Sequence, residues 1–247
     1  NRNYTAIQMM SRGVPMIVWG DEFTRTQNGN NNPYNIDSVA TWSNYNMINT
    51  VSPHAVATGG SGTYHNNFGT FNNTEGVNGN FMFMNYMLKL KASEPALNQP
   101  NYNVGYDFKK EDGKSTLVDG DRCVWIHIDG SSVSGGSDYL IFMNMYTSEV
   151  SYTIPTAATG KKWVRLVDTQ SYFETDFNCW DEKSATTVSS SYGVTPWSVV
   201  ILKEVENVVV PTVATPSISG SSYFDSSTTV TITCGTNGAT IYYTTDG

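Results

Sequence analysis

The alternation of apolar and polar positions changes character twice along the chain, and its first part has the pattern of an α/β protein. Residues 4–10 have helical spacing, and residues 14–19 form a continuous apolar run typical of a parallel strand buried on both faces. A long polar stretch follows, and residues 80–97 again have the pattern of a helix. Helix, strand, polar loop and helix form the repeating unit of an α/β barrel, whose sites lie past the carboxyl ends of the strands.

The second helix of this part is predicted to be amphipathic and to end near Pro95, because a proline disfavours helical backbone in the residue before it. Its buried face is predicted to carry residues at helical spacing, namely Phe81, Met84, Leu88 and Lys91–Ala92.

The middle part of the chain reads as many short strands. Apolar and aromatic runs alternate with turn signals such as Asp129-Gly130, which predicts an antiparallel β-sandwich of roughly seven strands. The strands are expected at residues 124–128, 139–145, 150–154, 163–167 and 198–202, among others.

The last part of the chain, after a linker, is rich in Ser and Thr. Residues 228–234 and 239–245 read as two strands joined by Asn237-Gly238, which predicts a hairpin in a small, partial β module. An isolated hairpin is only marginally stable in water.

Charge and composition exclude several classes of partner. The 247 residues contain 14 Lys and Arg against 22 Asp and Glu, a net charge of −8, which argues against binding to nucleic acid. No apolar run reaches the ~18 residues of a membrane span. The sequence also has no glycine-rich phosphate loop and no histidine spacing typical of a metal site, so we expect neither a cofactor nor a metal.

A long motif links the first part to a known family. Residues 11–34 match the run S-x-G-x-P-M-x-x-x-G-D-E-x-x-R-T-Q-x-G-N-N-N-x-Y. This run resembles the eighth barrel strand and following loop of the isoamylase and glycogen-debranching branch of family-13 glycoside hydrolases, the α-amylase superfamily. Asp37 and Trp42 continue the resemblance, and Glu94-Pro95-Ala96-Leu97 is similar to the end of that family's last barrel helix, with Lys91 in place of an Arg.

The resemblance continues along the chain and implies three domains. Residues 1–97 would be the last β/α unit of a (β/α)8 barrel, and residues 98–205 would be the family's C-terminal β-sandwich. Residues 206–247 would be a linker and a truncated immunoglobulin-like module, similar to the C-terminal module of chitobiases and of many secreted bacterial glycosidases. An extracellular or cell-surface location in a bacterium is therefore expected.

The resemblance also implies where catalysis takes place. Family-13 hydrolysis uses a carboxylate nucleophile, a carboxylic general acid and a third Asp, at the ends of barrel strands four, five and seven; a retaining pair lies ~5 Å apart. We expect these residues upstream of this chain, so no residue here is assigned a catalytic role. Asp21 and Glu22 are adjacent at the predicted strand end, where neighbouring side chains point in different directions. We therefore expect them to fix the loop or to line a subsite, rather than to act as an acid–base pair.

Polar residues of the loop after residue 20 are candidates for binding sugar. Amide and guanidinium donors suit hydroxyl-rich ligands, and aromatic faces suit pyranose rings. An alternative, left open by the sequence, is a loop held together by its own Asn side chains. The candidate substrate-binding residues are Asp21, Glu22, Arg25, Gln27, Asn30, Asn31, Tyr34 and Asp37.

The sequence therefore leads to one main function hypothesis and one rival. The main hypothesis is the C-terminal part of a starch- or glycogen-degrading α-glucan hydrolase of isoamylase type, which would work with an upstream catalytic barrel portion on a polysaccharide or oligosaccharide. Whether α-1,6 or α-1,4 links are cut stays open. The rival is a non-catalytic carbohydrate-binding or adhesion module.

Overall fold

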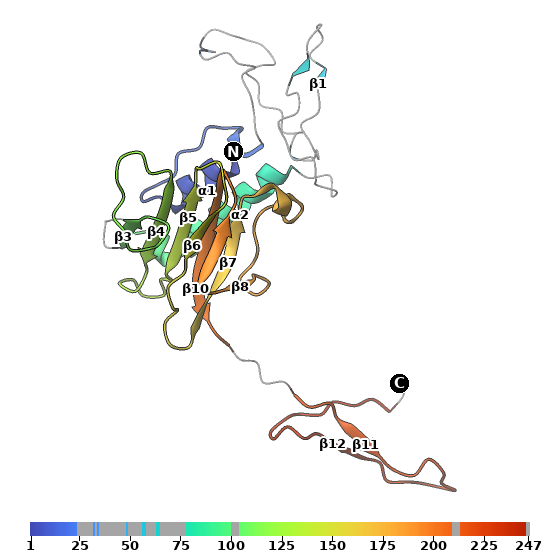
Figure 1. Ribbon diagram of the computed structural model, residues 1–247. Helices are drawn as coiled ribbons and strands as arrows, with labels where there is room; N and C mark the ends of the chain where they lie inside the picture. Colours follow the sequence, from blue (N-terminus) through green and yellow to red (C-terminus); the bar gives the residue numbers. More distant parts are fainter. Residues whose placement is uncertain are drawn as a thin grey trace. The chain divides into compact units, whose positions relative to one another are not determined.

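The computed structural model describes residues 1–23, 78–99, 104–208 and 213–245, together with Asn32, Tyr34, Ile48 and the pairs 56–57 and 63–64. The chain divides into two compact units, Asn1–Glu206 (unit 1) and Asn207–Gly247 (unit 2). The predicted boundary between residues 97 and 98 falls within unit 1. The described part is mostly β-sheet with few helices (Figure 1).

Unit 1 is built on an antiparallel sheet with the strand order β3-β4-β5-β10-β7-β8 among the described residues (Figure 1). A smaller sheet pairs β6 with β9, and β1 pairs with β2. The strands are β1 (Val56–Ala57), β2 (Thr63–Tyr64), β3 (Gly105–Lys109), β4 (Cys123–Asp129), β5 (Tyr139–Asn144), β6 (Val150–Thr153), β7 (Lys161–Asp168), β8 (Thr187–Val188), β9 (Ser191–Val194) and β10 (Ser198–Glu206).

The large sheet is buried on both faces. On one face, Ile141 of β5 and Ile201 of β10 join a core that contains residues of helices α1 (Arg2–Met10) and α2 (Gly79–Ser93). On the other face, Phe142 belongs to a second core with Tyr152 and Val194 of the β6–β9 sheet. Because successive side chains of a strand point to opposite faces, central strands covered on both sides need apolar residues at every position.

The buried face of helix α2 coincides only in part with the one predicted. Phe83 and Met87 are buried, whereas Leu88 and Ala92, predicted to be buried, are exposed. Met84 and Lys91 are buried as predicted. The helix ends at Ser93, and the 3-10 turn η3 (Pro95–Leu97) follows. Apolar residues occur on more than one side of this helix, so the packing of the sheet, and not the spacing alone, selects the buried face.

Residues 14–19 do not form the buried strand that their composition predicts. They follow α1 without pairing to any described strand. The side chains of Val14 and Met16 are 90% and 87% exposed, while Ile17 packs against the helix-side core. Within this chain the segment is therefore neither the predicted strand nor buried on both faces, because no described strand lies beside it. Burial by strands from outside this chain stays a prediction.

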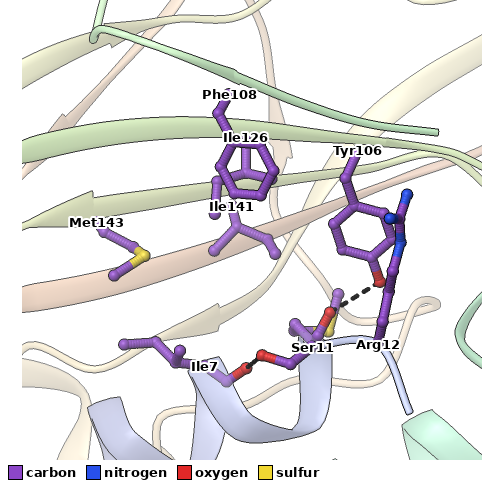
Figure 2. Close-up of a pocket in the computed structure, with 9 residues that line it drawn as sticks. Ile7, Ser11, Arg12, Tyr106, Phe108, Ile126, Ile141 and Met143 are labelled. Carbon is purple, nitrogen blue, oxygen red and sulfur yellow. Dashed lines mark hydrogen bonds between the residues drawn. The ribbon is translucent and has the colours of Figure 1, made fainter. Parts of the chain in front are cut away.

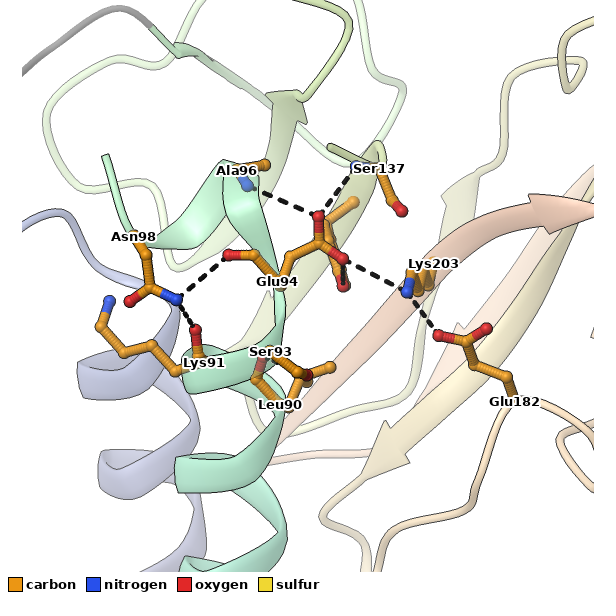
Figure 3. A network of polar contacts seen from close by, with 10 residues as sticks. Leu90, Lys91, Ser93, Glu94, Ala96, Asn98, Ser137, Glu182 and Lys203 are labelled. Atoms are coloured by element: carbon orange, nitrogen blue, oxygen red, sulfur yellow. Dashed lines mark hydrogen bonds and ion pairs between the residues drawn. The ribbon is translucent and has the colours of Figure 1, made fainter. Parts of the chain in front are cut away.

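A network of polar contacts fixes the end of α2 to the sheet (Figure 3). The buried Glu94 carboxylate accepts hydrogen bonds from the Ser137 N–H (2.9 Å) and the Tyr139 hydroxyl (2.7 Å). It also forms an ion pair with Lys203 of β10 (3.2 Å), which in turn pairs with Glu182. A buried carboxylate is tolerated only with such partners, so this network determines where the helix ends on the sheet.

Unit 2 contains one pair of short strands among its described residues, β11 (Ser217–Ser219) and β12 (Thr231–Thr233). The predicted hairpin between residues 228–234 and 239–245 is wrong, because β12 pairs with β11 and residues 239–245 form no strand. Sequence alternation predicted a strand at β12 but could not select its partner.

Candidate functional site

The predicted site begins at the tight turn η1 (Asp21–Phe23), which follows the exposed apolar segment. The Asp21 carboxylate accepts a hydrogen bond from the Val18 N–H (3.2 Å), and the Glu22 carboxylate accepts one from the Gly20 N–H (2.8 Å). Both carboxylates thus bind main-chain groups of the residues just before them. These contacts are those of side chains that shape a turn; whether the pair also lines a sugar subsite stays a prediction.

Two asparagines at the start of α2 hold this turn in place. Asn78 caps the helix by accepting from the N–H groups of Asn80 and Phe81, and its side-chain amide donates to the Phe23 carbonyl (3.3 Å). Asn80 donates to the carbonyls of Asp21 (3.1 Å) and of the next residue (3.2 Å). The turn is therefore fixed by the amino end of a helix that lies more than fifty residues further along the chain.

Sequence reasoning missed these two asparagines. Asn78 lies just before a helix rich in apolar residues, which is the position of an N-cap, so the capping role was readable from the sequence. The contacts with the turn were not readable, because nothing in local sequence indicates that the two segments meet.

Of the remaining predicted substrate-binding residues, the structure describes only Tyr34. Its side chain is 93% exposed, and its N–H donates to the Asn32 side chain (3.4 Å). The other candidates lie outside the described residues, namely Arg25, Gln27, Asn30, Asn31 and Asp37. The structure thus places Asp21 and Glu22 in one turn, and the arrangement of the other residues stays a prediction.

A groove of about 510 Å³ separates the apolar segment from α2. It is lined by Val14 and Pro15 on one side and by Leu88 and Ala92 of the helix on the other. At its base the buried Lys91 ammonium donates to three main-chain carbonyls, those of Met9, Ser11 and Leu97. The burial of this ammonium lowers its pKa below the ordinary value.

A smaller cavity of about 220 Å³ lies between α1 and the large sheet (Figure 2). Its walls are mainly apolar side chains such as Ile141 and Met143. The Tyr106 hydroxyl donates to the Met10 carbonyl (2.9 Å), and the Arg12 guanidinium lies 4.5 Å from the centroid of the tyrosine ring. Since these polar groups are engaged within the protein, the cavity is poorly suited to a hydroxyl-rich ligand.

The described residues contain no group of three or more His, Cys, Asp or Glu side chains placed to hold a metal ion. No helix in the described ranges has the length and apolar character needed to cross a membrane.

Comparison with known proteins shows which proteins this chain is similar to. Residues 109–203 match the family model "Isoamylase, C-terminal". An isoamylase from Flavobacterium sp. is 30% identical over 190 residues, which cover 70% of this chain and 21% of that protein. A glycogen operon protein GlgX homolog from Mycobacterium bovis is 23% identical over 181 residues, covering 68% of this chain and 23% of the relative.

Among solved structures, a pullulanase from Bacillus acidopullulyticus aligns with a TM-score of 0.49 and 17% identity, covering 82% of this chain and 20% of that one. The chain spans about a fifth of the length of the curated relatives it matches. It belongs with the C-terminal portions of the isoamylase and debranching branch of glycoside hydrolase family 13. The family resemblance stated from the sequence is thereby confirmed. The assignment of residues 14–19 to a barrel strand stays a prediction.

Proposed function

We propose that this chain is the C-terminal part of an α-glucan debranching enzyme of isoamylase type. The support is the match of residues 109–203 to the isoamylase C-terminal family and the printed names of the relatives, which are isoamylases and glycogen operon proteins. Those relatives are about five times as long as the matched region. The catalytic carboxylates would accordingly come from an upstream barrel portion that works with this chain.

The observation that carries this proposal is the apolar segment at residues 14–19. It forms no helix or strand, is largely exposed and unpaired among the described residues, and leads directly into the turn of Asp21 and Glu22. Apolar residues at successive positions suit a strand with neighbours on both sides. In the proposed enzyme, the segment would be the last strand of a (β/α)8 barrel, and upstream strands would cover it.

The helices on either side of the segment support the same arrangement. The ammonium of Lys91, in the last turn of α2, binds carbonyls at the end of α1, so the two helices run in the same direction. Parallel neighbouring helices joined by one connecting segment are what successive β/α units of a barrel provide. Residues 98–205 would then be the C-terminal β-sandwich and residues 206–247 the linker with a partial immunoglobulin-like module.

In this enzyme, the loop after residue 20 would form an outer substrate subsite. Asp21 and Glu22 would fix the turn, and the exposed ring of Tyr34 suits stacking on a pyranose. Arg25, Gln27, Asn30, Asn31 and Asp37 would supply donors and acceptors to sugar hydroxyls, as the sequence predicts.

The test is to express the complete gene product and to compare it with this chain alone. The complete product is expected to release reducing ends from amylopectin and to leave linear amylose intact, whereas this chain alone releases none. Release from amylose would indicate α-1,4 cleavage, and turnover by this chain alone would contradict the upstream location of the catalytic carboxylates. No release by the complete product would refute the proposed activity.

The rival function is a non-catalytic carbohydrate-binding or adhesion module, and one observation favours it. Tyr223 and Tyr242 of unit 2 are both 90% exposed, and Tyr243 is 71% exposed. Such rings suit glycan binding at a cell surface, consistent with the extracellular location proposed from the chitobiase-like resemblance. Retention of the complete product on starch without any release of reducing ends would favour this rival.

A further inference from the structure

Several exposed aromatic residues of unit 1 belong to segments that meet at one end of the large sheet. Outside residues 14–34, the exposed aromatic residues among the described positions of this unit are Tyr4, Phe108, Tyr146, Tyr172 and Trp197. Every one of them except Phe108 belongs to a segment at the end of the sheet where β10 begins, as the strand pairing and hydrogen bonds show. We call this end, with its four aromatic residues, the aromatic end.

Strand register places Trp197 and Tyr146 at the aromatic end. Ser198, the first residue of β10, pairs with Asn144, the last residue of β5. Trp197 immediately precedes this pair on one strand and Tyr146 follows it on the other. The Asn144 amide also donates to the carbonyl of Thr195 (3.2 Å), which ties the two turns together.

Tyr172 belongs to the same end through β7. Asp168, the last residue of β7, pairs with Val200 near the start of β10. The chain then continues through Thr169, whose N–H donates to the Val199 carbonyl (3.0 Å), into the 3-10 turn η4 (Ser171–Asp176). The Tyr172 side chain on this turn is 82% exposed.

The amino end of α1 completes the group. The side-chain amide of Asn3 donates to the Trp197 carbonyl (2.6 Å). The side-chain oxygen of Asn3 accepts a hydrogen bond from the Thr169 hydroxyl. Arg2 pairs with Glu174 of η4 (3.3 Å). These contacts hold the first turn of α1, which carries the exposed Tyr4, against both turns of the sheet.

Trp197 has an unusual backbone for its residue type. Its φ angle is +57°, in the left-handed region that glycine adopts without strain, and its side chain is 56% exposed. A bulky residue is strained in this region. An exposed aromatic ring that is kept at a strained position indicates a role other than packing.

The aromatic end lies on the same side of unit 1 as the candidate site. Because Lys91 joins the carboxyl ends of α1 and α2, the amino ends of both helices lie at the opposite end of the helix pair. The amino end of α2 holds the turn of Asp21 through Asn80, and the amino end of α1 holds the turn of Trp197.

We propose that Trp197, together with Tyr4, Tyr146 and Tyr172, forms a second α-glucan-binding surface. The inference rests on the proposed function, which supplies the ligand class. Indole and phenol rings offer flat apolar faces to pyranose rings while their N–H and O–H groups remain available for sugar hydroxyls. A surface at the same end as the candidate site holds a distant part of a long, branched substrate while another part occupies the site.

The test is native electrophoresis of the 247-residue chain in gels with and without amylopectin. Trp197→Gly removes the ring and the backbone strain together, so the variant is expected to melt at or above the temperature of the wild-type chain. Its apparent affinity for amylopectin is expected to fall about tenfold, in line with the loss of one aromatic contact. Phe108→Ala, which removes an exposed aromatic ring at another place on the sheet, is the matched control and is expected to migrate like the wild type.

Tyr172→Ser tests the same surface without altering the Trp197 turn, and it is expected to weaken the retardation as well. Equal retardation of the wild type and both variants, or no retardation of the wild-type chain by amylopectin, would overturn the proposal; a surface that binds a protein partner would give the second result. Failure of the proposed function is a different observation, the absence of reducing ends when the complete gene product is incubated with amylopectin.

Discussion

At the scale of single residues, Glu94 links the helical and sheet layers of unit 1. Its side chain is buried, and the structure gives it a hydroxyl, two main-chain N–H groups and an ammonium as partners. The ammonium belongs to Lys203, which also forms an ion pair with the far more exposed Glu182. The same lysine thus has one buried and one exposed carboxylate partner, and the contributions of these two ion pairs to stability can be compared.

We expect Glu94→Gln to lower the free energy of unfolding by about 2 to 4 kcal/mol, because it removes a charge whose partners stay buried. The matched variant Glu182→Gln is expected to cost less than about 1 kcal/mol, since solvent screens that pair. Urea denaturation of the whole chain measures both values. Equal losses would contradict the central position of Glu94 in the network of Figure 3.

Lys91 gives a pH dependence whose sign follows from its burial. Its pKa in the folded chain is lowered, chiefly by desolvation, whereas the unfolded chain keeps an ordinary lysine pKa of about 10.4. Between these two values the unfolded chain binds more protons than the folded chain, so the contribution of Lys91 to stability rises with pH.

The expected result is that Lys91→Met costs about 1 to 3 kcal/mol at neutral pH, because three carbonyls lose their donor. The difference in unfolding free energy between the wild type and this variant should widen as the pH is raised through the alkaline range toward the ordinary lysine pKa of about 10.4. Lys89→Met, an exposed position on the same helix, is the control and should show no such widening. If the difference in unfolding free energy between the wild type and Lys91→Met stayed constant or became smaller with rising pH, the lowered pKa of Lys91 would be contradicted.

At the scale of elements, the sequence predicted the central strands well. The predicted strands at residues 124–128, 139–145, 163–167 and 198–202 correspond to β4, β5, β7 and β10 and are confirmed. Their runs of apolar residues are long because both faces of the sheet are covered, and glycine-containing turns separate them. Local composition and burial thus agree in these elements, which is why they could be predicted.

Elements whose surroundings are set by distant segments were predicted less well. The buried face of α2 could not be derived from spacing, since Phe81, Phe83 and Met84 place apolar groups around much of the helix. The partner of β12 is similarly a long-range choice. For the site, the motif predicted Asp21 and Glu22. The hydrogen bonds from Asn78 and Asn80 that hold this turn join residues more than fifty positions apart, so no local sequence pattern predicts them.

At the scale of the whole molecule, burial is distributed unevenly between the units. Both hydrophobic cores consist of residues up to Val205, and no described residue after Glu206 is buried. Unit 2 has only the three-residue strands β11 and β12 among its described residues. A pair of strands without a covered apolar face is marginal in water, whereas strands buried on both faces open only with the whole domain.

Hydrogen exchange of the complete 247-residue chain should therefore divide at the linker. Peptides that contain β11 and β12 are expected to exchange at close to the rate of an unstructured chain, and peptides from β5 and β10 at least about a thousandfold more slowly. Peptides covering residues 14–19, exposed and unpaired although they belong to unit 1, provide the internal control and should exchange fast. Protection of β12 equal to that of β10 would mean that unit 2 is an independently stable module. Fast exchange of β12 together with slow exchange of β10 would assign the stability of the chain to the large sheet and its two helices.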